Sequence, residues 1–133
     1  MALQWKNGAS WESIPDAALY STWSGTYHIE YPPPQSVGID GSQAAQTGKP
    51  RIVINAPWLT DDGFDFWRDR FGSSTAETAA ISIEAWEPRT GANVKWAGVM
   101  RRPTYESIGV GSTTSNTIYR NVTIEIWECA TTT

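Results

Sequence analysis

The 133-residue sequence has very few of the residues on which most catalytic and metal sites depend. It contains one cysteine, Cys129, and one histidine, His28. A single cysteine excludes an internal disulfide framework, and one cysteine with one histidine cannot supply the usual ligand set of a zinc site. We therefore expect a fold held together by a hydrophobic core, with no metal and no other cofactor.

Positive charge and long hydrophobic runs are also scarce. The chain has three lysines, its charged residues make up 18 %, and its net charge is −4 at pH 7. This composition lacks the clustered basic footprint of a protein that coats nucleic acid. No apolar run approaches the ~20 residues that cross a bilayer, and the amino terminus does not read as a signal peptide. The sequence predicts a soluble protein made in the cytoplasm, with no membrane partner.

Tryptophan, in contrast, is abundant. Eight tryptophans lie in a chain whose length suits one domain, spanning residues 1–133. Because tryptophan is enriched at interfaces and at ligand-stacking sites, the excess favours assembly or binding. A tryptophan-rich core is the alternative.

Two segments carry nearly the same six residues. Residues 82–87 read Ser-Ile-Glu-Ala-Trp-Glu, and residues 123–128 read Thr-Ile-Glu-Ile-Trp-Glu. Successive side chains of a strand point to opposite faces. We therefore expect a core face and an outward face on each strand. The core face would carry Ile81, Ile83, Ala85, Val122, Ile124 and Ile126, and the outward face would carry Glu84, Trp86, Glu125 and Trp127.

The rest of the chain predicts further strands and one helix. Strands are expected near residues 3–5, 11–14 and 22–31, and another at 51–55 that Pro57 ends. A hairpin is expected from strands 78–87 and 93–102 with a five-residue turn, and a long closing strand at 117–128. The helix is expected at 61–71, with Thr60 as its N-cap. Its aromatic stripe, which would pack on a sheet, is formed by Phe64, Trp67 and Phe71.

Residues 32–50 are rich in Pro, Gly, Gln, Ser and Ala. A connection of this length without its own secondary structure is uncommon in a compact domain. We interpret it as an arm that orders against a neighbouring subunit, and a surface loop is the alternative. The apolar residues that the arm would bury are Val37, Ile39, Ala44 and Ala45.

The candidates for chemistry are few, and we expect no enzyme. His28 lies in an alternating strand without a nucleophile motif. Asp61, Asp62 and Asp65 lack the spacing of a calcium loop, and a helix start explains them. Residues 109–113 lack the lysine of a phosphate-binding loop. The strongest enzymatic alternative places Glu84 and Glu125 on adjacent strands, as the carboxylate pair of a retaining glycosidase.

A second alternative uses the same residues without catalysis. Trp86 and Trp127 would be the sugar platforms of a noncatalytic carbohydrate-binding β-sandwich. The overall pattern predicts a mainly β fold, an antiparallel β-sandwich or partly open β-barrel, with one α-helix packed on it and a long arm loop at residues 32–50.

In its order of elements, the chain resembles the major tail tube proteins of long-tailed bacteriophages and, more distantly, the tube protein of type VI secretion. The resemblance rests on the arm 32–50, the helix 61–71 after the central strands, and the long closing strand 117–128. It implies a virion structural protein of stacked hexameric rings, which binds its own copies and other phage tail proteins and takes no small-molecule substrate. A tail terminator or baseplate ring protein is a further alternative.

On this resemblance DNA passes through the tube without specific binding. Glu84 and Glu125 would face the lumen and repel its phosphates. The expected subunit-interface residues are Trp86, Trp127, Val37, Ile39, Ala44 and Ala45. Two placements of the indoles stay open: they pack under a neighbouring subunit, or the aromatic stripe of the helix covers them.

Overall fold

The structure, a computed structural model, describes residues 3–19, 27–31, 49–110 and 117–133. Within these ranges the fold is mainly antiparallel β with a single α-helix packed on the sheet, as the sequence predicts. The strands are β1 (Gln4–Asn7), β2 (Ser10–Ser13), β3 (Tyr27–Glu30), β4 (Arg51–Thr60), β5 (Thr78–Glu87), β6 (Ala92–Arg101), β7 (Ser107–Val110) and β8 (Thr117–Thr131). The helix is α1 (Asp61–Arg68), and two 3-10 turns are η1 (Asp16–Ala18) and η3 (Asp69–Phe71).

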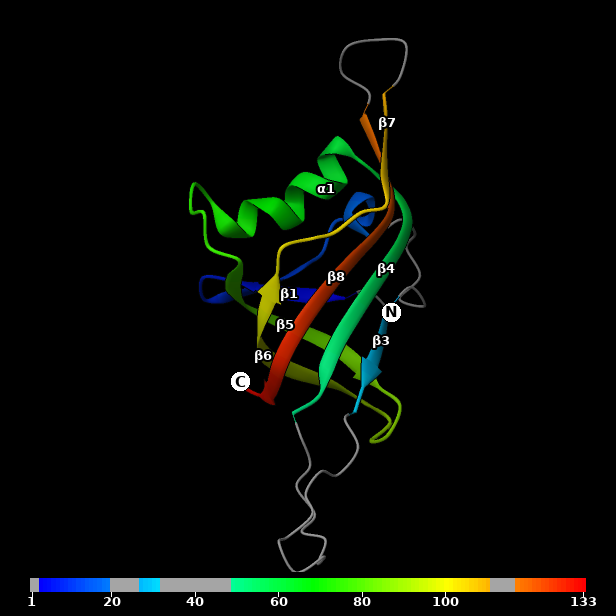
Figure 1. The fold of residues 1–133 in the computed structure, drawn as a ribbon. Coiled ribbons are helices and arrows are strands. Elements are labelled where there is room, and N and C mark those ends of the chain that lie inside the picture. The colour runs from blue at the N-terminus through cyan, green and yellow to red at the C-terminus, as the bar shows by residue number, and fades with distance from the viewer. Residues whose placement is uncertain (1–2, 20–26, 32–48, 111–116) are drawn as a thin grey trace, which may run out of the picture.

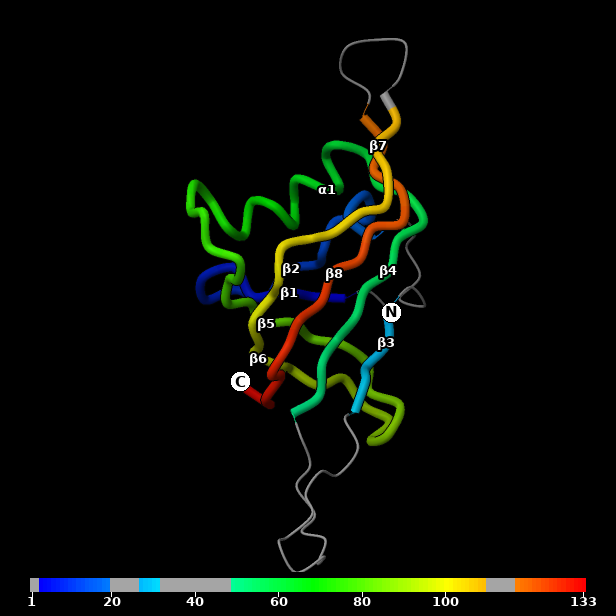
Figure 2. The backbone as a smooth tube through the Cα atoms, viewed as in Figure 1, coloured from blue at the N-terminus to red at the C-terminus, as the bar shows by residue number. Residues whose placement is uncertain are grey.

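The strands form one sheet in the order β2-β1-β5-β6-β8-β4-β3, and β7 pairs with β8 beside this path. The sheet bends strongly without closing into a barrel. In Figure 1, β4 and β8 run diagonally in front, and β1, β5 and β6 cross behind them. The tube in Figure 2 shows the same two halves facing each other. The core therefore lies inside the bend, and the other sheet face is turned outward.

Alternation along the two echoed strands decides which side chains fill the core. All six residues expected on the core face are buried, and Glu84, Trp86, Glu125 and Trp127 lie on the outward face. The prediction of a core face and an outward face is confirmed. The core cluster draws on both halves of the bent sheet, from Ile83 on β5 to Ile54 on β4.

The helix covers the core at one open side of the sheet, where it contacts η1, β4 and β8. Phe64, Trp67 and Phe71 are all buried. The ring of Phe64 stacks on Tyr119 of β8 with centroids 4.0 Å apart. Because this stripe faces the core, it does not cover Trp86 or Trp127. The placement of the two indoles under the helix is therefore wrong.

The helix termini differ from the prediction in detail. Thr60 occupies the N-cap position but makes no capping hydrogen bond through its side chain. The carboxylate of Asp61 accepts a hydrogen bond from the backbone N–H of Thr117 at 3.4 Å. The α-helix ends at Arg68, and the chain continues as the 3-10 turn η3 up to Gly72, whose φ of 57° suits glycine.

Strand β4 does not end at Pro57, as the sequence predicted, but continues to Thr60. The β4–β8 register passes from Ala56↔Val122 to Trp58↔Arg120, which leaves Pro57 without a partner opposite Asn121. Asn121 has a left-handed backbone with a φ of 53°. The register is the same on both sides of this position, so only the pair between Pro57 and Asn121 is missing from the ladder. The strand therefore tolerates a residue that cannot donate a hydrogen bond there.

Other boundaries shift by a few residues. The turn between β5 and β6 has four residues, 88–91, instead of five, and β8 extends three residues past Glu128 through a second left-handed residue. Residues 22–26 of the predicted strand 22–31 lie outside the described residues. So does the arm apart from Lys49 and Pro50, together with Val37, Ile39, Ala44 and Ala45. In the described part of the chain, no helix is long and apolar enough to span a bilayer.

Candidate functional site on the outward sheet face

The echoed strands β5 and β8 belong to one sheet, but β6 lies between them. Glu84 is opposite Lys95 on β6, whereas the Met100↔Ile126 pair places Glu125 near the far end of that strand. Five residues along a strand correspond to about 17 Å. The two carboxylates therefore cannot work as a retaining glycosidase pair, which needs about 5 Å, and the adjacent-strand expectation is wrong.

Both glutamates are compensated by cations. The ammonium of Lys95 lies 3.9 Å from the Glu84 carboxylate, and the guanidinium of Arg51 lies 3.5 Å from that of Glu125. Arg51 also pairs with Glu30 on β3. Each carboxylate therefore has a cation beside it that offsets part of its negative charge, and a lumen-facing role for the two glutamates stays a prediction.

Trp127 lies between two arginines on the neighbouring strands. The guanidinium carbon of Arg51 on β4 is 4.6 Å from the indole centroid, and that of Arg101 on β6 is 5.2 Å away. Cation–π contacts of this kind contribute about 0.5–1 kcal/mol each at exposed sites. Trp127 remains 36 % exposed and Trp86 40 % exposed. Trp86 pairs with Asn93 and Trp127 with Val99, so the indoles do not form one platform.

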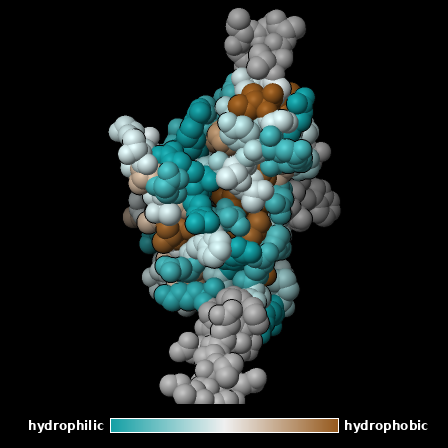
Figure 3. Space-filling view, in the orientation of Figure 1, coloured by the Kyte–Doolittle hydropathy of each residue, from teal (hydrophilic) through white to brown (hydrophobic). Residues whose placement is uncertain are grey.

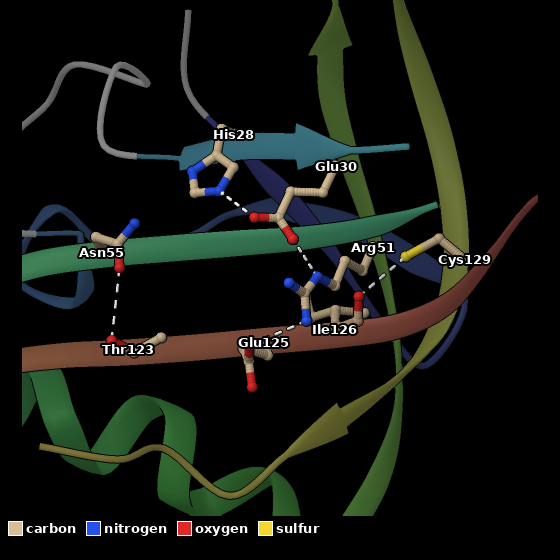
Figure 4. Close-up of polar contacts among 8 residues, drawn as sticks. All are labelled: His28, Glu30, Arg51, Asn55, Thr123, Glu125, Ile126 and Cys129. Atoms are coloured by element: carbon tan, nitrogen blue, oxygen red, sulfur yellow. Dashed lines mark hydrogen bonds and ion pairs between the residues drawn. The ribbon is translucent and has the colours of Figure 1, made fainter. Parts of the chain in front are cut away.

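The Arg51 cluster extends to the sheet edge. Figure 4 shows His28, Glu30, Arg51 and Glu125 on the neighbouring strands β3, β4 and β8. His28 Nε2 lies 3.1 Å from Glu30 Oε1. The hydrogen bond from His28, followed by that from Arg51, lowers the pKa of the Glu30 carboxyl below its ordinary value of 4.5. Each ionisable group in this cluster has an opposite charge or a hydrogen bond as partner, which gives it a structural reason to be present.

The described residues do not hold an arrangement that metal chemistry would need. Among them, no three His, Cys, Asp or Glu side chains are grouped so that they could bind a metal ion. Cys129 is buried, its thiol donates to the carbonyl oxygen of Ile126 at 3.4 Å, and burial raises its pKa to about 11. A buried thiol with a raised pKa is a poor nucleophile.

A buried carboxylate that the sequence analysis did not single out joins the two halves of the sheet. Glu87, at the end of β5, is 6 % exposed. It accepts hydrogen bonds from the hydroxyl of Tyr31, just after β3, and from that of Thr90 at 2.8 Å. The Tyr27 hydroxyl donates to the carbonyl oxygen of Trp86 at 2.9 Å. Alternation was the available signal, since Glu87 follows Ala85 by two residues on the core face.

The hydrogen bond between Tyr31 and Glu87 predicts an unusual tyrosine titration. Desolvation and then the hydrogen bond to Glu87 raise the pKa of Tyr31 to about 12. In an ultraviolet absorbance titration we expect one late tyrosine step that Tyr31→Phe removes. The raised pKa means that the associated stability is complete below pH 10, the ordinary value, and is lost as the pH rises toward 12. An unchanged titration curve for Tyr31→Phe would contradict the assignment.

An open groove of about 440 Å³ lies on β3, β4 and β8, lined by described residues. It lies where Pro57 and Asn121 face each other without a β pair. Sequence reasoning missed it, because which residues face each other depends on how two distant strands pair. The groove is lined by Tyr27, His28, Asn55, Ala56, Pro57, Asn121, Val122 and Thr123.

Exposed apolar side chains also gather where β7 meets the start of β8 and the end of β4. Ile108 of β7 and Trp58 of β4 are each 45 % exposed, Ile118 of β8 is 36 % exposed, and Tyr105, just before β7, is 43 % exposed. The space-filling view in Figure 3 shows an apolar patch at this end of the molecule.

A scan against protein-family models and searches of curated proteins and of solved structures found no match to this chain.

Proposed function

We propose that the chain is a virion structural protein whose copies form stacked hexameric rings of a phage tail tube, through which DNA passes. The observation that carries the proposal is the exposure of Trp86 and Trp127 on the outside of a sheet whose core is already filled. Large apolar side chains exposed on a folded domain are typical of surfaces that bind a partner. In this proposal the partner is another copy of the chain.

The arrangement of the elements supports the same proposal. The helix follows β4, and the closing strand β8 is the longest strand in the described part of the chain, with 15 residues. Both features belong to the architectural resemblance to tail tube proteins. On the side of β8 the sheet ends in the short strand β3, and a short edge strand suits a subunit whose neighbour covers it.

The ion pairs change one part of the proposal. Lys95 and Arg51 compensate Glu84 and Glu125. In a lumen, these paired carboxylates would repel DNA less strongly than unpaired ones, so the proposal does not depend on them. Trp127 becomes the main candidate for the subunit contact, because two arginines hold its ring in place before a partner binds. Tryptophan and arginine are the residue types that most often dominate binding at interfaces, and a ring held in advance loses less entropy on binding.

Assembly is measured directly by light scattering over a wide concentration range, together with negative-stain microscopy. We expect rings or tubes of the wild-type protein. Trp127→Ala should raise the concentration needed for assembly about 30-fold, which corresponds to about 2 kcal/mol. Trp11→Ala is the matched control, because Trp11 is a half-buried indole between Lys6 and Lys95 on the opposite edge of the sheet.

The control should assemble as the wild type does. A wild-type protein that stays monomeric at all concentrations, also after addition of phage neck or tip components, would contradict the proposal. A single closed ring that does not stack would instead indicate the terminator or baseplate alternative.

A further inference from the structure

We propose that the groove on β3, β4 and β8 binds an uncharged, hydroxyl-rich ligand, a mono- or disaccharide. This is a binding activity beyond the structural role in a ring. It uses neither Trp86 nor Trp127, which lie apart from each other and outside the groove lining.

Three polar side chains of the groove have hydrogen-bonding capacity left over. Asn55 Oδ1 accepts from the Thr123 hydroxyl at 3.5 Å, so the two donors of the Asn55 amide nitrogen have no partner among the described residues. His28 uses Nε2 toward Glu30, which leaves Nδ1. The Asn121 amide nitrogen donates to Glu106, which leaves its carbonyl oxygen. Donors and acceptors thus occur side by side, as hydroxyl groups require.

The sheet fixes the spacing of these groups. His28, Asn55 and Thr123 lie on three neighbouring strands, and Asn55 is directly opposite Thr123 (Figure 4). Neighbouring strands are about 4.8 Å apart, a separation that suits hydroxyls at different positions of one pyranose ring. Because the strands hold the side chains in place, little conformational entropy is lost when a ligand binds.

The described part of the groove lining offers no charged side chain to a bound ion, which disfavours charged ligands. Among the described residues, no Asp, Glu, Lys or Arg lines the groove, and the nearby Glu30 and Arg51 already pair with each other. A charged ligand would lose hydration without gaining an opposite charge. A sugar hydroxyl exchanges its bonds to water for bonds to amide, hydroxyl and imidazole groups, and its net charge is zero.

The remaining lining includes one exposed apolar side chain. Pro57 contributes apolar surface beside the polar side chains, whereas the side chains of Ala56 and Val122 are buried in the core, each 1 % exposed. The volume of about 440 Å³ falls in the range of small-molecule sites, about 300–1,000 Å³. A groove that stays open to solvent buries only part of such a ligand, so we expect millimolar affinity.

The backbone at the groove has an uncommon conformation of the kind found at binding sites. Asn121 has a φ of 53°, and left-handed conformations of residues other than glycine are uncommon and often occur at functional sites. It faces Pro57 at a position where the β4–β8 ladder lacks a pair, and both residues line the groove.

The test is an NMR titration of ¹⁵N-labelled protein with maltose, lactose and N,N′-diacetylchitobiose, at a protein concentration where light scattering shows monomer. We expect saturable shift changes at His28, Asn55 and Thr123, with a Kd of about 1–10 mM for at least one sugar. Asn55→Leu keeps the side-chain size and removes the amide, and it should weaken binding at least tenfold. Asn93→Leu makes the same change on the outward face of β6, away from the groove, and should bind as the wild type does.

Three results would overturn the proposal. The first is the absence of saturable shifts with all three sugars up to about 50 mM. The second is equal binding by Asn55→Leu and the wild type, and the third is a set of shifts confined to Trp86 and Trp127. Because the titration uses monomer, its outcome is independent of whether rings form.

Discussion

Replacement of Trp67 by alanine is expected to lower the free energy of unfolding by about 3–5 kcal/mol, the usual range for a large aromatic side chain removed from a core. Trp67 is 0 % exposed, and its indole N–H donates to the carbonyl oxygen of Ala18 at 2.9 Å. The substitution leaves a cavity under α1 and a buried carbonyl without its donor. Urea unfolding followed by circular dichroism measures the change.

Two further variants separate the contributions at this position. Trp67→Phe fills most of the cavity but cannot donate to Ala18, so it should lose about 1–3 kcal/mol. It also keeps the prediction testable if Trp67→Ala does not fold. Trp86→Ala removes an indole that is 40 % exposed, and it should cost less than about 1 kcal/mol in the monomer. Equal losses for Trp67→Ala and Trp86→Ala would contradict the placement of the helix.

Replacement of Gly63 by alanine is expected to destabilise the protein by about 3 kcal/mol, the upper part of the range for an overpacked core. Gly63 lies inside α1, where intrinsic propensity alone would predict a gain of about 1 kcal/mol from alanine. In the fold, an added Cβ would lie 2.0 Å from the carbonyl oxygen of Ala17 and 2.8 Å from its carbonyl carbon. Both are backbone atoms, so α1 and η1 would have to move apart.

Gly8→Ala is the matched control for this substitution. Gly8 has a φ of 63°, and an added Cβ would meet nothing within 4 Å. It should therefore lose only the cost of the left-handed backbone, about 1–2 kcal/mol. Thermal unfolding of both variants checks the comparison. A Gly63→Ala protein more stable than the wild type would show that propensity dominates and that α1 does not pack closely on η1.

Trp67 and Gly63 show what a local sequence pattern can and cannot predict. Spacing along the helix was enough to predict that Phe64, Trp67 and Phe71 share one face. It carried no information about the acceptor of the Trp67 indole, because Ala18 lies 49 residues earlier in the chain. For the same reason, the sequence analysis had no basis for treating Gly63 as a close contact between two helical segments.

The candidate site shows the same difference between what local spacing predicts and what long-range contacts decide. Alternation along β5 and β8 correctly predicted that Glu84, Trp86, Glu125 and Trp127 face outward. It did not predict that β6 separates the two strands, because strand order depends on pairing between distant segments. The expected carboxylate pair on adjacent strands was wrong for this reason.

The sequence by itself determined the mainly antiparallel β fold, the one helix, and which side chains of β5 and β8 are buried. These properties follow from local periods, two residues for a strand and 3.6 for a helix, and the chain displays them without a partner. The tertiary structure decided the cations at Glu84 and Glu125, the hydrogen bond between Tyr31 and Glu87, the facing of Pro57 and Asn121, and the groove beside them. Each of these depends on the register between strands that are far apart in the sequence, and only the folded sheet sets that register.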